Sequence, residues 1–152
     1  MSRRASRRHS FILVYQIEFY AQPDICQIFK LYDAEFITGE DNAGKTTVDS
    51  GFVRAQAYGI CENLEFIDGV INRYITGWSF ARIAKIDLAI LRLAIYELAF
   101  MPDIPTRVCI NEAVELAKIY GGDDAHSFVN GLLASAQKEL RPGHNPIQGV
   151  QS

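Results

Sequence analysis

The chain has 152 residues, of which 49% are hydrophobic and 22% are charged, and this length and composition suit one folded domain with its own core. No run of residues resembles a signal peptide or a membrane span, so we expect a cytoplasmic protein. The net charge of −3 argues against a protein that binds nucleic acid over its whole surface.

The basic residues are nevertheless unevenly distributed along the chain. Four of the fifteen lysines and arginines fall within the first eight positions: Arg3, Arg4, Arg7 and Arg8. The remainder of the chain is correspondingly more acidic. An acidic body with a basic N-terminal arm indicates local, oriented contact with an anionic partner.

The residue spacing predicts a first helix over residues 3–21 that carries this arm. The last three of its four arginines stand three and four residues apart and therefore share one face. Tyr15 continues that face, while Ile12 and Phe19 are expected to fill the apolar side. Arginines beside an aromatic side chain suit a phosphate backbone with a base stacked next to it. The alternative is a solvated basic tail.

The segment Lys85–Met101, KIDLAILRLAIYELAFM, is apolar almost all round the helical wheel. Such a helix is either a membrane span or the centre of a packed domain. This segment carries Arg92 and Glu97 in its body and is shorter than the roughly 20 apolar residues that a span requires. We therefore predict a buried central helix, in which Arg92 and Glu97 pair with each other or with Glu112. Asp87 near its start can cap free N–H groups.

The remaining pattern is also helical. Further helices are predicted at residues 23–32, 51–76, 106–120 and 124–140, with a loop over 33–48. No segment has the pattern of a sheet, so we predict an all-α fold of about seven helices. Residues 1–140 are expected to form a single domain, and residues 141–152, from Arg141 onward, a disordered tail.

Individual residues predict how some of these helices end or pack. Ser50 is the predicted cap of the helix over 51–76. The pair Gly121-Gly122 is expected to end the next-to-last helix with a left-handed C-cap. Gly131 lies inside the last helix, where a glycine is unfavourable, and therefore indicates a close contact with another helix.

The predicted loop contains a sequence that matches a phosphate-binding pattern. Gly39–Thr46 reads GEDNAGKT and fits GxxxxGK[ST]. In such a loop, backbone N–H groups surround the phosphates, Lys45 would reach the β and γ oxygens, and Thr46 would hold Mg²⁺. The pattern should follow a buried strand and begin a helix of a parallel sheet, and no sheet is predicted here. We therefore expect a polar loop between helices and keep nucleotide binding as the alternative.

The cysteines point to no redox or metal chemistry. Cys26, Cys61 and Cys109 are odd in number and far apart, and no CxxC pair is present. Neither a zinc site nor a disulfide framework is indicated. Cys61 and Cys109 fall in apolar helical patterns and are expected to be small buried side chains. We expect no metal and no cofactor.

Four stretches of the chain are more specific than their helical patterns alone. They are the arginine-rich start that runs to Val14-Tyr15-Gln16, Arg82–Leu98 (RIAKIDLAILRLAIYEL), Ile104–Gly121 (IPTRVCINEAVELAKIYG) and His126–Leu133 (HSFVNGLL). Together they resemble the NusB family of transcription antitermination factors. The likeness extends from about Arg3 to Leu140, whereas the middle loop and the tail match nothing.

This resemblance implies an all-helical fold of two small bundles and no catalysis, so no enzyme is expected. It implies binding of a short boxA-type single-stranded RNA in ribosomal RNA transcripts, together with NusE, a small-subunit ribosomal protein. The RNA polymerase antitermination complex is then the wider partner, and a homodimer is compatible with the likeness. The alternative within this class is a helical dimerisation module whose RNA site is masked.

The family's RNA-contacting positions fall on eight residues of this chain: Arg3, Arg4, Arg7, Arg8, Tyr15, Asp87, Asp124 and Phe128. Arginines would engage phosphates, and aromatic side chains would stack on bases. Asp87 would accept a hydrogen bond from a base amino group or contact NusE. Asp87 and Asp124 could instead be helix caps, and Phe128 could belong to the core.

Three positions depart from the family's pattern. Arg8 stands where a glutamate is frequent, Ile12 where a glutamine is frequent, and Ser127 where a lysine usually precedes the phenylalanine. The first change adds positive charge to the arm, and the third removes it near Phe128. The resemblance therefore implies a shifted footprint on the RNA.

Overall fold

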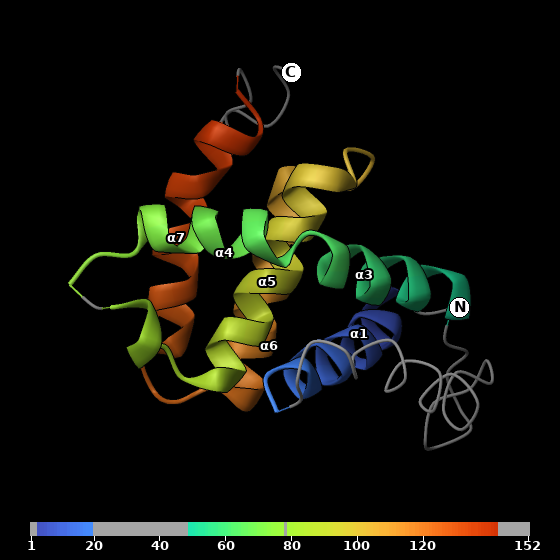
Figure 1. The fold of residues 1–152 in the computed structure, drawn as a ribbon, viewed down its shortest axis with the longest axis horizontal. Helices are drawn as coiled ribbons and strands as arrows, with labels where there is room; N and C mark the ends of the chain where they lie inside the picture. Colours follow the sequence, from blue (N-terminus) through green and yellow to red (C-terminus); the bar gives the residue numbers. More distant parts are fainter. Residues whose placement is uncertain (1–2, 20–48, 78, 143–152) are drawn as a thin grey trace. The chain divides into compact units, whose positions relative to one another are not determined.

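The computed structural model describes residues 3–19, 49–77 and 79–142 of the chain (Figure 1). Within these ranges the chain forms six α-helices, a 3₁₀ turn and no strand, which confirms the predicted all-α fold. The chain forms two compact units, Met1–Asn63 and Leu64–Ser152. The helix predicted over 23–32 and the loop predicted over 33–48 lie outside the described residues.

The described helices divide between the two units. In chain order they are α1 (Arg3–Ile17) and α3 (Ser50–Glu62) in the first unit, then α4 (Leu64–Tyr74), the 3₁₀ turn η2 (Phe80–Arg82), α5 (Lys85–Phe100), α6 (Thr106–Tyr120) and α7 (Ala125–Leu140) in the second. In the first unit α1 packs against α3. In the second unit α5 packs against α4, α6 and α7, so it is the central helix of that unit.

The start of α3 is fixed by Asp49. Its carboxylate Oδ1 accepts a hydrogen bond from the Phe52 amide at 3.1 Å, so the predicted cap, Ser50, is wrong by one residue. The backbone amide of Asp49 donates to the Ser6 hydroxyl at 2.9 Å. One residue therefore both begins α3 and ties it to α1.

The helix predicted over 51–76 is in fact two helices, because Asn63 interrupts it. The backbone nitrogen of Asn63 donates to the carbonyls of Gly59 and Ile60, both at 3.1 Å. Its side-chain Nδ2 donates to the Gly59 carbonyl at 2.7 Å. An asparagine side chain that bonds the preceding turn competes with continued helical pairing. Consequently α3 ends at Glu62 and α4 begins at Leu64.

The buried side of α1 differs from the prediction. Ile12 and Phe19 are exposed, at 40% and 58%, rather than part of the apolar side. Four residues spaced as one helical stripe are buried instead: Ser6, Ser10, Leu13 and Ile17. Two members of this stripe are serines, so hydrophobic periodicity does not reveal it.

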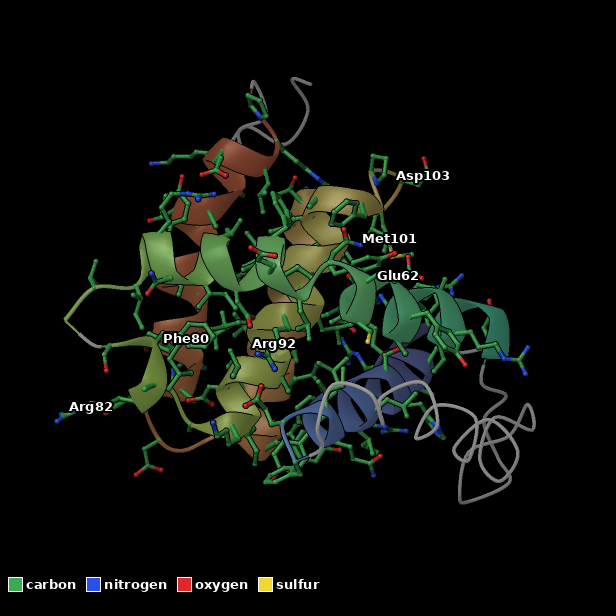
Figure 2. The ribbon with its side chains drawn as sticks, in the orientation of Figure 1. Glu62, Phe80, Arg82, Arg92, Met101 and Asp103 are labelled. Carbon is green, nitrogen blue, oxygen red and sulfur yellow. The ribbon has the colours of Figure 1, made fainter. Side chains whose placement is uncertain are left out.

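Ten of the sixteen residues of α5 are buried, which confirms the prediction of a buried central helix. Among them is Arg92 (Figure 2). Its Nε and Nη2 donate to the two oxygens of Asp68 on α4, at 2.8 and 2.7 Å. The sequence did not predict Asp68 as a partner, and this two-point pair connects α5 to the preceding helix. Such parallel bonds fix the orientation of both side chains.

The glycines do not act as predicted. Gly121 has φ −88°, and the described residue with positive φ is Gly77, so α6 does not end in a left-handed cap. A Cβ on Gly121 would instead lie 2.6 Å from the Cβ of Ala125 and 2.8 Å from the Ala117 carbonyl oxygen, so close approach of the chain requires glycine there. Around Gly131 there is open space, so the predicted close helix contact is wrong.

The chain beyond α7 is not simply a tail, because Arg141 is buried. Its guanidinium donates to five acceptors between the end of α5 and the start of α6: the carbonyls of Glu97, Leu98, Met101 and Ile104 and the Thr106 hydroxyl, at 2.6–3.1 Å. The tail expected from Arg141 onward is therefore wrong for this residue. Residues 143–152 lie outside the described part of the chain.

Among the helices of the described ranges, none combines the length and the apolar character needed to cross a membrane.

The Arg141 contacts predict a large loss of stability when the guanidinium is removed. Arg141→Ala should lower the free energy of unfolding by at least about 2 kcal/mol, because hydrogen bonds to a charged group contribute about 1.5–3 kcal/mol each. Urea denaturation measures the effect. Lys138→Ala, at an exposed position of α7, is the control and should change stability by less than about 0.5 kcal/mol. Equal midpoints for the two variants would show that the Arg141 contacts contribute nothing.

Candidate nucleic-acid interface

The four predicted arginines of α1 differ in how much surface they present. Arg3 and Arg4 are exposed and Arg8 is half-buried, whereas Arg7 is only 5% exposed. The guanidinium carbon of Arg7 lies 5.8 Å from the centre of the Phe52 ring. The basic surface of the arm is therefore formed mainly by the other three arginines.

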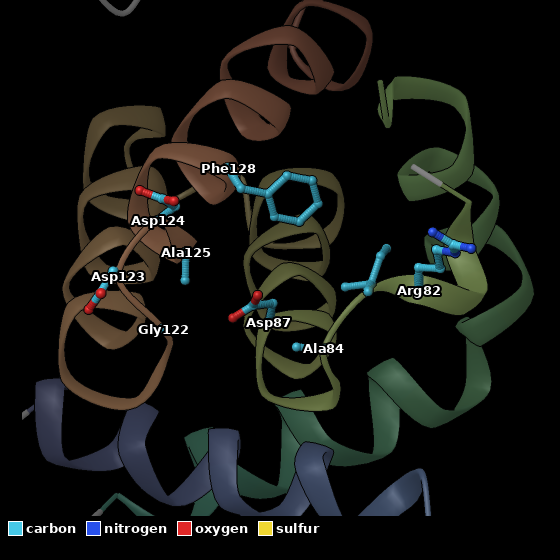
Figure 3. Close-up of a pocket in the computed structure, with 9 residues that line it drawn as sticks. Arg82, Ala84, Asp87, Gly122, Asp123, Asp124, Ala125 and Phe128 are labelled. Carbon is cyan, nitrogen blue, oxygen red and sulfur yellow. The ribbon is translucent and has the colours of Figure 1, made fainter. Parts of the chain in front are cut away.

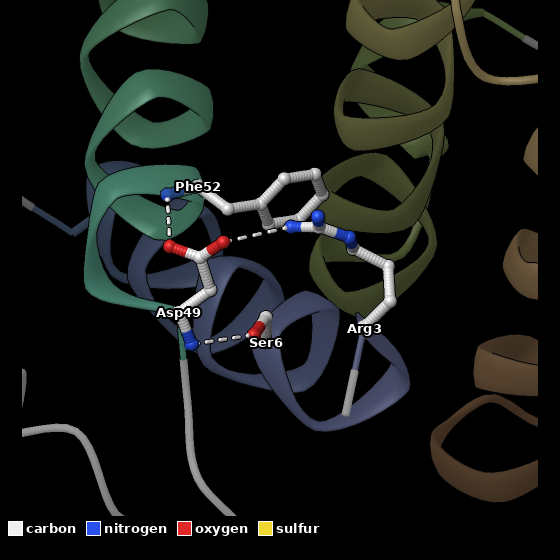
Figure 4. Close-up of polar contacts among 4 residues, drawn as sticks. All are labelled: Arg3, Ser6, Asp49 and Phe52. Carbon is white, nitrogen blue, oxygen red and sulfur yellow. Dashed lines mark hydrogen bonds and ion pairs between the residues drawn. The ribbon is translucent and has the colours of Figure 1, made fainter. Parts of the chain in front are cut away.

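Arg3 is held by two residues from the start of α3 (Figure 4). Its Nη1 lies 3.3 Å from Oδ2 of Asp49, and its guanidinium carbon lies 4.0 Å from the centre of the Phe52 ring. A cation at this distance over an aromatic face is attracted by the ring. Sequence reasoning missed both partners, since they lie more than forty residues from Arg3 and no local pattern connects them.

Aromatic side chains form a row along α1. The ring of Tyr15 lies 6.5 Å from that of Phe11 and 5.1 Å from that of Phe19, the second pair meeting edge to face. Phe11 is buried, Tyr15 is half-buried and Phe19 is exposed. The row thus runs from the core to the surface, and Tyr15 and Phe19 offer ring surface that a base could cover.

The other three predicted residues meet in one pocket of about 290 Å³ (Figure 3). Asp87 comes from the first turn of α5, Asp124 immediately precedes α7, and Phe128 lies in the first turn of α7. Arg82 and Asp123 also line the pocket and were not predicted. The packing of α5 against α7 brings these two helix starts together.

The two predicted aspartates do not act as helix caps. Asp124 occupies the N-cap position of α7 but makes no side-chain capping bond. The N-cap position of α5 is Ala84, and Oδ1 of Asp87 is buried without a hydrogen-bond partner. Gly121 lies against this carboxylate, because a Cβ there would be 3.1 Å from the same Oδ1. An orphaned buried oxygen of this kind carries a desolvation cost.

The pocket and the arm of α1 differ in the charge that they present. Burial raises the pKa of the Asp87 carboxyl above its ordinary value, because the charged form is less well solvated. The pocket contains three carboxylates, from Asp87, Asp123 and Asp124, and one guanidinium, from Arg82. Carboxylates accept hydrogen bonds from amino groups and repel phosphate. The pocket therefore suits an N–H donor beside an aromatic ring, whereas the arm suits phosphates.

The phosphate-binding pattern Gly39–Thr46 lies outside the described residues, and the structure does not bear on it. Within residues 3–19, 49–77 and 79–142, no group of three or more His, Cys, Asp or Glu side chains is placed to hold a metal ion.

Comparison with known proteins identifies the family of the chain. The model of the NusB family matches residues 4–138. The chain belongs to the NusB family. The transcription antitermination protein NusB of Ruminiclostridium cellulolyticum is 39% identical over 152 residues, which cover 100% of this chain and 99% of that protein. The NusB of Acetivibrio thermocellus is 41% identical over 138 residues, or 91% of this chain and 90% of that protein.

Two solved structures resemble the chain. The structure of T. maritima NusB matches the chain with a TM-score of 0.77 and 38% identity, over 93% of this chain and 94% of that one. A chain in the crystal structure of a plectonemic RNA supercoil matches with a TM-score of 0.74 over 93% of this chain and 98% of that one. Its identity is 23%, so it shows a likeness of fold alone.

The environment of Asp87 predicts a pH-dependent effect on stability. Because its folded-state pKa is raised, the ionised carboxylate destabilises the fold, and this penalty appears as pH rises through the folded-state pKa. Asp87→Asn should therefore raise the unfolding temperature at neutral pH. The gain should shrink as pH falls toward the unfolded-state pKa of about 3.9.

Thermal unfolding followed by circular dichroism between neutral and acid pH measures this difference. Asp123→Asn, which removes an exposed carboxylate from the same pocket, is the control and should change the unfolding temperature little. If Asp87→Asn is less stable than the parent at every pH, the carboxylate supports the fold and the assignment of an orphaned oxygen is wrong.

Proposed function

We propose that this protein is a transcription antitermination factor that binds boxA-type single-stranded RNA of ribosomal RNA transcripts together with NusE. The observation that carries the proposal is the full-length match to NusB proteins, whose described function is transcription antitermination. Two further features support it: the exposed arginines of α1 and the pocket between the starts of α5 and α7.

In this proposal α1 binds the RNA backbone. Arg3, Arg4 and Arg8 have surface to offer to phosphates, and Tyr15 and Phe19 offer ring surface to a base. Single-stranded RNA suits such a surface because its unstacked bases are free to cover aromatic side chains. Arg7, a member of the same predicted set, is buried and would support the arm from within.

The pocket binds a base rather than a phosphate. Phe128 is half-buried and lines the pocket, so one part of its ring is available for stacking. The carboxylates of Asp87 and Asp124, which line the pocket, would accept hydrogen bonds from base amino groups. The Asp87 carboxylate is equally suited to a donor from NusE, and comparing RNA binding with and without NusE separates these two roles.

The salt dependence of RNA binding tests the role of the arm. Each phosphate contact on single-stranded RNA contributes about 0.7 to the slope of log K against log salt concentration. Arg4→Ala and Arg8→Ala should each weaken binding at low salt and flatten this slope by about 0.7. Fluorescence anisotropy with a labelled boxA-type RNA from the host's ribosomal leader measures both quantities, with and without NusE.

Two controls define the result. Arg107→Ala removes an exposed positive charge from α6 and should leave the slope unchanged. A duplex of the same RNA sequence should bind more weakly than the single strand, because its bases are not free to stack on protein side chains. Unchanged slopes in both α1 variants would exclude the arm from RNA binding, and equal binding of unrelated single strands would exclude boxA recognition.

A further inference from the structure

Arg3 and Asp49 form an ion pair, and the carboxylate of this pair opposes the phosphate binding proposed for Arg3. Arg3 belongs to the proposed phosphate-binding arm, yet its Nη1 lies 3.3 Å from a carboxylate oxygen of the same chain. The side chains of the pair are 51% and 33% exposed, so both reach solvent (Figure 4). A phosphate that approaches Arg3 therefore also approaches the negative charge of Asp49.

The Asp49 carboxylate is fixed rather than free to turn away. Its Oδ1 accepts the hydrogen bond from the Phe52 amide that begins α3, and its backbone amide donates to Ser6 of α1. The second oxygen, Oδ2, is the one directed at Arg3. Since the cap and the tie to α1 both hold Asp49 in place, the ion pair is preformed in the folded protein.

The Phe52 ring holds Arg3 from the other side. The guanidinium carbon lies 4.0 Å from the ring centre, while Nη1 alone is directed at the carboxylate. A guanidinium has five N–H donors, so a single contact to Asp49 leaves donors for a phosphate. The Phe52 ring therefore holds the Arg3 guanidinium in position, and the Asp49 carboxylate offsets its positive charge.

From this geometry we propose that Asp49 limits the RNA affinity of the arm by competing with phosphate for Arg3. The inference rests on the proposed RNA-binding function and goes beyond it, because it assigns a role to a residue outside the RNA-contacting set. An exposed ion pair of this kind is weak, so it lowers affinity without blocking the site.

Asp49→Asn tests the competition and preserves the fold. Asparagine is as good an N-cap as aspartate, so the bond from the Phe52 amide can be kept while the charge is removed. RNA affinity should rise about two- to fivefold at low salt, in line with the strength of exposed ion pairs. The gain should shrink as salt is added, because screening weakens the interactions of exposed charges. Asp49→Ser, another good cap, should behave in the same way.

Glu62→Gln is the matched control, because it removes one exposed negative charge from the other end of the same helix. Its RNA affinity should equal that of the parent, which excludes a general effect of net charge. Arg3→Ala provides the second control. If Asp49 acts through Arg3, adding Asp49→Asn to Arg3→Ala should give no gain, as a double-mutant cycle requires of coupled residues.

The outcomes separate this inference from the proposed function. A parent protein that binds no boxA-type RNA, with or without NusE, overturns the proposed function and the role of Asp49 with it. A parent that binds RNA, together with Asp49→Asn and Asp49→Ser variants that are folded but bind no more tightly, overturns only the competition. An equal gain in the Arg3→Ala background also overturns it, because the effect would then not pass through Arg3.

Discussion

The second unit of the structure depends on the burial of α5. This helix packs against three others, and a residue remote in sequence lies against each of its ends. At its C-terminal end the carbonyls of Glu97, Leu98 and Met101 accept hydrogen bonds from Arg141. At its N-terminal end Gly121 allows the chain after α6 to pass close to Asp87. The pocket lies at this end of α5, and the connections before α5 and after α6 also supply residues that line it.

The two candidate binding surfaces have opposite charge character. The arm of α1 presents arginines, which attract phosphates at any sequence, while the pocket presents carboxylates and an aromatic ring, which suit the edge and the face of a base. Such a division explains how a chain with a net charge of −3 can be suited to RNA. Four of the fifteen basic residues are concentrated in the part that would meet the backbone, and the pocket, with three carboxylates and one guanidinium, would favour groups that donate hydrogen bonds.

Much of the fold could be predicted because some signals are local. The all-round apolar pattern of Lys85–Met101 was sufficient for a buried central helix. The resemblance to NusB identified Asp87, Asp124 and Phe128 as a set, and the structure brings these three into one pocket. Their contact with RNA stays a prediction, as does that of the arginines.

The missed features depend on partners that are distant in sequence or on polar side chains. Asn63 ends α3 through a hydrogen bond of its own side-chain amide, and a hydrophobic pattern does not reveal such a bond. Ser6 and Ser10 belong to the buried stripe of α1, although serine gives no apolar signal. Arg141 follows the last predicted helix and looks like the start of a polar tail, because its acceptors are about forty residues away.

The proposal on which the rest depends is that boxA-type RNA contacts the exposed arginines of α1 and that the pocket of the second unit takes a base. It can be tested by mapping backbone amide chemical-shift changes by NMR during titration with boxA-type RNA. Changes are expected at Arg4, Arg8 and Tyr15 and at Asp87 and Phe128. Changes confined to other surfaces, such as the Arg73–Glu139 ion pair between α4 and α7, would contradict it.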